Sequence, residues 1–147
     1  MFLWPVRVYY EDTDSGGVVY YANYLRFLER ARTEFLRSLG FEQDRLAAEE
    51  GVIFVVRSLD IDYLRPACFN DRLMVSAAPN ELSGAGLRFS QRIWRADDLT
   101  GPSEDSDTET ICAEADCLCR AEVRVVCLDR ATMRPRRLPK AMKEILE

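Results

Sequence analysis

Aspartate is the residue type best placed to do chemistry in this sequence. The chain contains no histidine, which excludes Ser-His-Asp and Cys-His catalytic sites, histidine-ligated zinc and a histidine general base. Catalysis must therefore rest on carboxylates, tyrosine, lysine or cysteine. Asp12 and Asp14 lie in the turn-forming run Asp-Thr-Asp-Ser-Gly-Gly, directly upstream of the clearest helix pattern in the chain. A carboxylate there can act as a nucleophile or as a general base.

The predicted helix supplies a second chemical feature, its free backbone N–H groups. The first N–H groups of a helix have no acceptor within it and carry partial positive charge, so they stabilise a carbonyl oxygen that becomes an oxyanion. Asp14 lies just before this helix, so one small site would hold both a carboxylate and an oxyanion hole. The alternative is that Asp12 or Asp14 only caps the turn, and spacing alone favours it because such turns are common. Asn23 is either a capping residue or a hydrogen-bonding group of the site.

The helix itself is predicted from apolar residues that recur at helical spacing from Tyr24 to Leu39, with Gly40 as its C-terminal stop. Apolar residues occupy more than half of its circumference, so we expect it to be covered on most sides. Tyr20, Tyr24 and Phe27 are expected to be core residues. A short second helix is predicted over residues 43–50.

The rest of the chain shows the alternating, β-branched and aromatic patterns that are typical of strands. The expected strands span residues 7–11, 52–63, 72–78, 87–94 and 113–128, and residues 139–146 are expected to form a closing helix. Residues 97–110 are polar and acidic and are expected to form a mobile loop. This order predicts a single α+β domain over residues 1–147, in which an antiparallel β-sheet wraps around a central α-helix.

Composition narrows the class of protein further. With 147 residues, 48% hydrophobic and 31% charged, the chain is neither disordered nor collagen-like. No stretch approaches the ~18 apolar residues of a spanning helix, and the apolar start is too short for a signal peptide. These features predict a cytoplasmic protein without a membrane span.

The five cysteines are expected to be reduced, because their number is odd and nothing indicates secretion. Cys117, Cys119 and Cys127 share parity, so a strand would bury them on one face as small apolar residues. No metal site is expected, because only one pair of cysteines is close in sequence.

Charge is unevenly spread around a net value of −5. Residues 97–116 contain eight acids and no base, whereas residues 130–143 contain six bases and no acid. Such blocks usually mark solvated surface, although a basic segment can also bind a phosphorylated ligand. Nucleic acid is a weak candidate, because the chain is acidic and lacks a stripe of interleaved basic and aromatic residues.

The run RVYYEDTDSGGVVYYANYLRFLERAR (residues 7–32) resembles the signature of the 4-hydroxybenzoyl-CoA thioesterase family, and more narrowly its Tol-Pal-system-associated acyl-CoA thioesterases. The similarity continues through FVVR (54–57), YLRPA (63–67), ND (70–71), VVCLD (125–129) and RPRRLP (134–139), so it covers nearly the whole chain. The fold of this family is the hotdog, an antiparallel sheet around a central helix, in agreement with the element order predicted above.

This resemblance implies hydrolysis of an acyl-CoA thioester to a free acid and CoA, without a metal or organic cofactor. It implies that Asp14 is catalytic, as nucleophile or as general base, together with Tyr10 and Tyr21. The backbone N–H groups of Val19, Tyr20 and Tyr21 would form the oxyanion hole. Tyr21 stands where the Tol-Pal-associated branch usually has histidine, which leaves the acyl preference open.

The resemblance also implies binding partners. Arg57, Arg136 and Lys140 are candidates to bind the phosphates of CoA, although Arg57 is equally well explained as a charge that protects a strand edge from aggregation. A homo-oligomer, either dimer or tetramer, is implied, and an acyl carrier protein is a further candidate partner. Two alternatives stay open: a non-catalytic acyl-carrier or envelope-complex partner protein with this fold, and a thioesterase for aryl-CoA such as hydroxybenzoyl- or hydroxynaphthoyl-CoA. The acidic segment is longer than the turn expected at that place.

Overall fold

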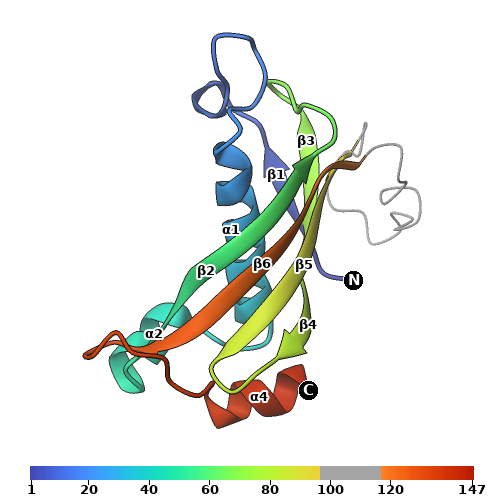
Figure 1. Cartoon of the computed structure of the whole chain (residues 1–147). Helices are drawn as coiled ribbons and strands as arrows, with labels where there is room; N and C mark the ends of the chain where they lie inside the picture. The colour runs from blue at the N-terminus through green and yellow to red at the C-terminus, as the bar shows by residue number, and fades with distance from the viewer. Residues whose placement is uncertain (97–116) are drawn as a thin grey trace.

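The computed structural model describes residues 1–96 and 117–147 (Figure 1). An antiparallel sheet crosses the molecule diagonally, and the long helix α1 lies behind it. The elements are β1 (Leu3–Arg7), the 3-10 turn η1 (Tyr10–Asp12), α1 (Asn23–Ser38), α2 (Gln43–Glu49), β2 (Val52–Tyr63), β3 (Arg72–Ser76), β4 (Ala78–Leu82), β5 (Gly86–Arg95), β6 (Cys117–Asp129) and α4 (Lys140–Leu146).

The sheet has the strand order β1-β3-β5-β6-β2, with β4 also paired to β5. All the pairings are antiparallel, and the longest joins β2 to β6 from Val52↔Asp129 to Tyr63↔Cys119. β2 is therefore a long edge strand, and its far end brings Tyr63 toward the beginning of α1. The predicted α+β arrangement of an antiparallel sheet around a helix is confirmed.

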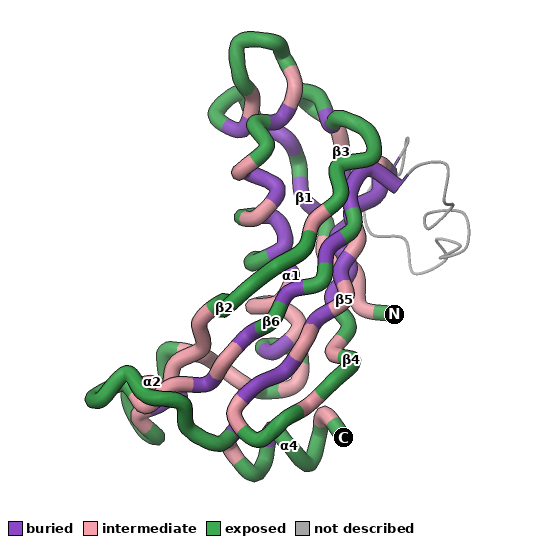
Figure 2. Tube along the Cα trace, viewed as in Figure 1, coloured by how far each residue is buried: buried purple, intermediate pink, exposed green. Residues whose placement is uncertain are grey.

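The core lies between α1 and the inner face of the sheet (Figure 2). On β6 the odd-numbered residues from Cys117 to Cys127 are buried, while Arg120, Glu122 and Arg124 between them are exposed. The predicted burial of Cys117, Cys119 and Cys127 is thus confirmed. Burial raises the pKa of the Cys119 thiol to about 12, so this thiol is a protonated core group at neutral pH.

Two local predictions are wrong. The first strand covers Leu3–Arg7 instead of residues 7–11, because the chain turns into η1 after Arg7. Pro5 is tolerated in β1 because β1 is an edge strand. Tyr20 is exposed instead of buried. α1 exposes one stripe of charged residues, including Arg26, Glu29 and Arg30, and most of its other residues are buried or half-buried, as predicted.

The remaining element predictions hold with small shifts of boundary. The strand expected over residues 72–78 divides into β3 and β4, and both short helices are present. Residues 97–110, expected to form a mobile loop, lie outside the described residues. Within the described ranges, no helix is both long and apolar enough to cross a membrane.

Candidate active site

The loop that carries Asp14 folds back on itself before α1 begins. A β-bridge pairs Thr13 with Val19, and the Asp14 N–H donates to the Val18 carbonyl at 2.9 Å. Asp14 Oδ1 accepts the Gly16 N–H at 2.8 Å, so one carboxylate oxygen does cap the turn. Asp14 is exposed, and no described residue donates to Oδ2. One oxygen of this carboxylate thus remains available to a substrate or to water.

Asp12 is in the opposite situation. Its carboxylate is buried, with Oδ2 accepting the Tyr9 N–H at 2.9 Å and Oδ1 accepting the Asn23 side-chain amide at 3.0 Å. Both oxygens therefore connect the strand end, the loop and the first residue of α1. The structure gives Asn23 a structural role as the donor to Asp12.

Backbone N–H groups without an acceptor occur at fewer positions than the sequence predicts. The Val19 N–H donates to the Ala67 carbonyl at 2.8 Å, and the Tyr20 N–H donates to the Asp12 carbonyl at 2.9 Å. Those two groups are not available to a ligand in this conformation. The N–H groups of Tyr21 and Ala22 have no acceptor among the described residues, and they lie at the start of α1. Of the three predicted oxyanion donors, Tyr21 alone remains, and Ala22 is a candidate that the sequence reasoning missed.

The end of β2 and the segment after it support this turn. The Tyr63 hydroxyl donates to the Tyr21 carbonyl at 2.9 Å, and the Ala67 N–H donates to the Tyr24 hydroxyl at 2.9 Å. Tyr63 also packs edge-on against Tyr24, with ring centroids 5.3 Å apart. Sequence reasoning did not assign a role to Tyr63, although it lies at the start of the YLRPA motif.

Exposed aromatic rings surround the loop. Tyr10 stacks on Phe69 with ring centroids 3.8 Å apart and an interplanar angle of 5°. Tyr20 and Tyr21 lie next to each other with centroids 4.8 Å apart, and both are exposed. A hydrogen bond with the Tyr21 side chain is the main cause that raises the pKa of the Tyr20 hydroxyl. These rings form an exposed aromatic surface on segments that precede and follow Asp14 in the chain.

The structure does not bring the three predicted CoA-binding residues together. Arg57 lines a cavity of about 270 Å³ whose other charged residues are Arg88, Arg124 and Glu81. Arg136 is not among the residues that line this cavity, although Pro135 is, and its guanidinium is engaged, because it donates to the Glu50 carbonyl at 2.7 Å and pairs with a carboxylate of β6.

Lys140 is highly exposed on α4, where its ammonium group lies 4.0 Å from Glu144. It does not line the cavity of Arg57.

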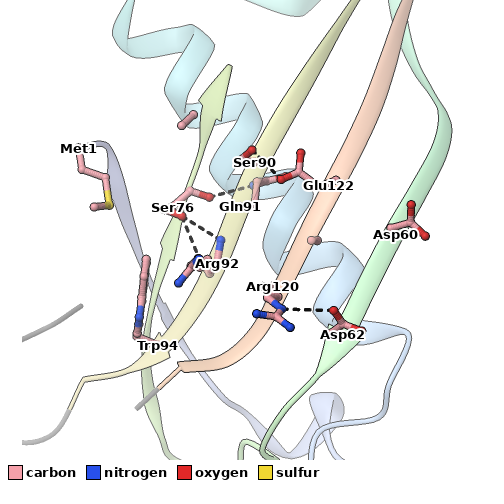
Figure 3. Close-up of a pocket in the computed structure, with 12 residues that line it drawn as sticks. Met1, Asp60, Asp62, Ser76, Ser90, Gln91, Arg92, Trp94, Arg120 and Glu122 are labelled. Carbon is pink, nitrogen blue, oxygen red and sulfur yellow. Dashed lines mark hydrogen bonds and ion pairs between the residues drawn. The ribbon is translucent and has the colours of Figure 1, made fainter. Parts of the chain in front are cut away.

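A larger cavity of about 650 Å³ lies on the face of the sheet opposite α1 (Figure 3). Its charged groups are partly paired with one another, since Arg120 binds Asp62 at 3.2 Å and Ser90 donates to Glu122 at 2.7 Å. No residue of the Asp14 loop lines this cavity. In the described ranges, no three cysteine, aspartate or glutamate side chains converge in a way that could hold a metal ion.

The fold and the loop are those of a known class of enzyme. Residues 16–102 match the Thioesterase superfamily, and the chain belongs to this superfamily. It is 45% identical over 142 residues to the acyl-CoA thioesterase YbgC of Haemophilus influenzae. This alignment covers 97% of this chain and 91% of that protein. It is 36% identical over 140 residues to the acyl-CoA thioesterase YbgC of Helicobacter pylori, covering 95% and 96%. The predicted family and its thioester-hydrolase class are confirmed.

Solved structures agree on the fold. A 1,4-dihydroxy-2-naphthoyl-CoA thioesterase from Synechocystis superimposes with a TM-score of 0.81 at 23% identity, covering 99% of this chain and 94% of that one. The predicted hotdog fold is therefore confirmed.

Proposed function

We propose that this protein hydrolyses acyl-CoA thioesters, with Asp14 as the catalytic carboxylate and the N–H groups at the start of α1 as the oxyanion hole. The observation that carries the proposal is the combination of two unused groups in one short segment. Asp14 has a free oxygen, and the N–H groups of Tyr21 and Ala22 have no acceptor among the described residues. Similarity to relatives named acyl-CoA thioesterase supports the choice of substrate.

The reaction needs only these groups and water. The thioester carbonyl oxygen accepts hydrogen bonds from the Tyr21 and Ala22 N–H groups, which stabilise the negative charge of the tetrahedral intermediate. Asp14 either attacks the carbonyl carbon and expels the CoA thiolate, leaving a mixed anhydride that water cleaves, or it removes a proton from the attacking water. A single turnover in ¹⁸O-labelled water tests these routes, because label in the Asp14 carboxylate with unlabelled acid requires an anhydride that water cleaves at the aspartyl carbon.

The exposed rings give the acyl group a surface to bind. We assign Tyr10 and Tyr21 to contacts with the acyl group, because Tyr10 is held flat against Phe69 and Tyr21 projects from the oxyanion turn. This surface favours a second candidate within the same chemistry, an aryl-CoA substrate whose ring would stack there.

The cavity of Arg57 is our candidate site for the phosphates of CoA. It brings three guanidinium groups together with one carboxylate, and Arg88 lies 3.7 Å from Glu81. Arg88 and Arg124 are directly opposite each other on β5 and β6, an arrangement of like charges that a bound anion would stabilise. The revised set is therefore Arg57, Arg88 and Arg124. The contacts of Arg136 fit a structural role, and Lys140 is not part of this cavity.

The exposed edge of the sheet supports a homodimer formed through β2. β2 is a 12-residue edge strand that exposes Val56 and Leu59. An unpaired edge of this length favours pairing with a second strand, and a second copy offers the same edge. Leu59→Glu should give a monomer in light scattering where the wild type gives a dimer or tetramer. A Leu59→Glu variant with the oligomeric state of the wild type would place the contact elsewhere.

Thiol release from short-chain, long-chain and aryl-CoA substrates tests the proposed function. The relative rates of release from alkyl and aryl thioesters identify the acyl preference. Thioesters of acyl carrier protein in the same assay test whether this protein is also a partner. No release from any of them would contradict the proposal and favour a non-catalytic partner protein. We place the activity in the cytoplasm, where CoA thioesters occur.

A further inference from the structure

A side-chain hydrogen bond joins the last residue of β2 to the turn before α1. The Tyr63 hydroxyl donates to the Tyr21 carbonyl oxygen at 2.9 Å, across 42 positions of sequence. Its ring packs edge-on against Tyr24 at an interplanar angle of 64°. Burial is the main cause that raises the pKa of Tyr63, so its hydroxyl keeps its proton at neutral pH and can donate it.

This hydrogen bond acts on the peptide group next to the proposed oxyanion hole. The Tyr21 carbonyl and the Ala22 N–H belong to one planar peptide group, so a donor held on the carbonyl fixes the direction of that N–H. A hydrogen bond to the carbonyl also polarises the amide and strengthens its N–H as a donor. The Ala22 N–H has no acceptor among the described residues, which leaves it available to a substrate carbonyl.

The turn does not depend on Tyr63 alone for its fold. The Val19 N–H donates to the Ala67 carbonyl, the Tyr24 hydroxyl accepts the Ala67 N–H, and the Tyr20 N–H donates to the Asp12 carbonyl. These three hydrogen bonds hold the same segment to two other parts of the chain. Loss of one hydroxyl at position 63 therefore leaves the segment in place and removes only the donor to the peptide group.

We propose that Tyr63 is a positioning residue for thioester hydrolysis, whose hydroxyl orients and polarises the Tyr21–Ala22 peptide group toward the substrate carbonyl. This inference rests on the proposed function, because it concerns the same oxyanion hole. Tyr63 itself does not contact the reacting atoms. Its effect is expected in the transition state, where the carbonyl oxygen carries most charge, and much less in binding of the ground state.

Tyr63→Phe tests the proposal, because it removes the hydroxyl and keeps the ring against Tyr24. We expect kcat to fall roughly three- to tenfold, as for the loss of one neutral hydrogen bond, while KM changes less than about twofold. Tyr9→Phe is the matched control, since Tyr9 is exposed and its hydroxyl has no partner among the described residues. We expect this control to have the kcat and KM of the wild type.

A spectroscopic measurement separates positioning from a purely structural role. A ketone analogue of acyl-CoA, with a methylene group in place of sulfur, should show a lowered carbonyl stretching frequency when bound to the wild type. In Tyr63→Phe this band should move part of the way back toward its value in water. A wild-type kcat in Tyr63→Phe, a change in KM alone, or an unchanged ketone band would overturn the proposal. If the wild type hydrolyses no thioester, the proposed function fails, and the ketone band still decides the role of Tyr63.

Discussion

Asp12 and Asp14 carry the same carboxylate two positions apart, yet the fold places them in opposite situations. Asp12 is buried, and both of its oxygens accept hydrogen bonds from the protein. Asp14 is exposed, and only one of its oxygens accepts one. The difference teaches that the residue type alone does not define a candidate catalytic group. What distinguishes Asp14 is a carboxylate oxygen, Oδ2, that accepts no hydrogen bond from the described residues.

The arginines show the same contrast. The Arg136 guanidinium donates to the Glu50 carbonyl and pairs with Asp129. Arg57 and Arg124 instead line a cavity in which Glu81 is the one acidic lining residue described. We therefore expect substitution of the unengaged groups to change kinetics and substitution of the engaged groups to change stability. The three predictions that follow test this separation.

The largest effect is expected at the two aspartates. Asp14→Asn should lower kcat by more than about a hundredfold, the scale of lost acid–base or nucleophilic help, with little change in Tm. Asp12→Asn should retain most of the activity but lower the free energy of unfolding by about 1–3 kcal/mol, because a buried acceptor is lost. Thiol-release kinetics and thermal unfolding of both variants provide the measurement.

The outcome that contradicts this contrast is specific. Asp14→Asn with more than about a tenth of the wild-type turnover would exclude Asp14 from the chemistry. If Asp12→Asn lost the most turnover without any loss of stability, the roles of the two aspartates would be exchanged.

Local sequence patterns alone did not distinguish Asp12 from Asp14, and the family resemblance was needed to select Asp14. Periodicity predicted α1, the two short helices and most strands, because burial imposes a repeat on the residues. The run of residues 12–17 predicted a turn with a carboxylate in it. Whether Asp12 or Asp14 would be buried depended on the Asn23 side chain, which reaches Asp12 from α1.

The availability of the oxyanion donors and the make-up of the arginine cavity likewise depend on contacts between distant segments. The Val19 N–H is occupied because residue 67, far along the chain, returns to it, and no local pattern shows this contact. Arg57 was found from the resemblance, but Arg88 and Arg124 join it only through the register of β5 with β6. Contacts between distant segments decide which groups stay unengaged.

The second prediction concerns the arginines. Arg57→Ala combined with Arg124→Ala should raise KM for acyl-CoA several-fold with little change in kcat, because phosphates far from the thioester contribute binding that is equal in ground and transition states. Salt should produce the same defect in the wild type, since screening acts over about 8 Å at physiological ionic strength. The steady-state constants are measured with acyl-CoA and with the matching acyl-pantetheine.

Arg136→Ala is the matched control from the engaged group. It should lower Tm, because it releases the Glu50 carbonyl, and leave KM close to that of the wild type. A KM defect that persists with acyl-pantetheine would show that Arg57 and Arg124 act on something other than the phosphates. A KM defect in Arg136→Ala alone would restore the basic C-terminal segment as the CoA site.

The smallest effect is expected at Cys119, which is fully buried. Burial raises the pKa of its thiol from 9.0 to about 12, so between these values the unfolded chain loses a proton that the folded chain keeps. The contribution of this thiol to the free energy of unfolding is fully present below pH 9, the pKa of the thiol in the unfolded chain. It is lost as pH rises toward the folded pKa, with a loss of about 1 kcal/mol near pH 10. The difference in Tm between the wild type and Cys119→Ala should therefore shrink by a few degrees from about pH 8 to about pH 10. Cys68→Ala, which alters an exposed thiol, should show no such trend, and a constant difference for Cys119→Ala across this range would contradict the prediction.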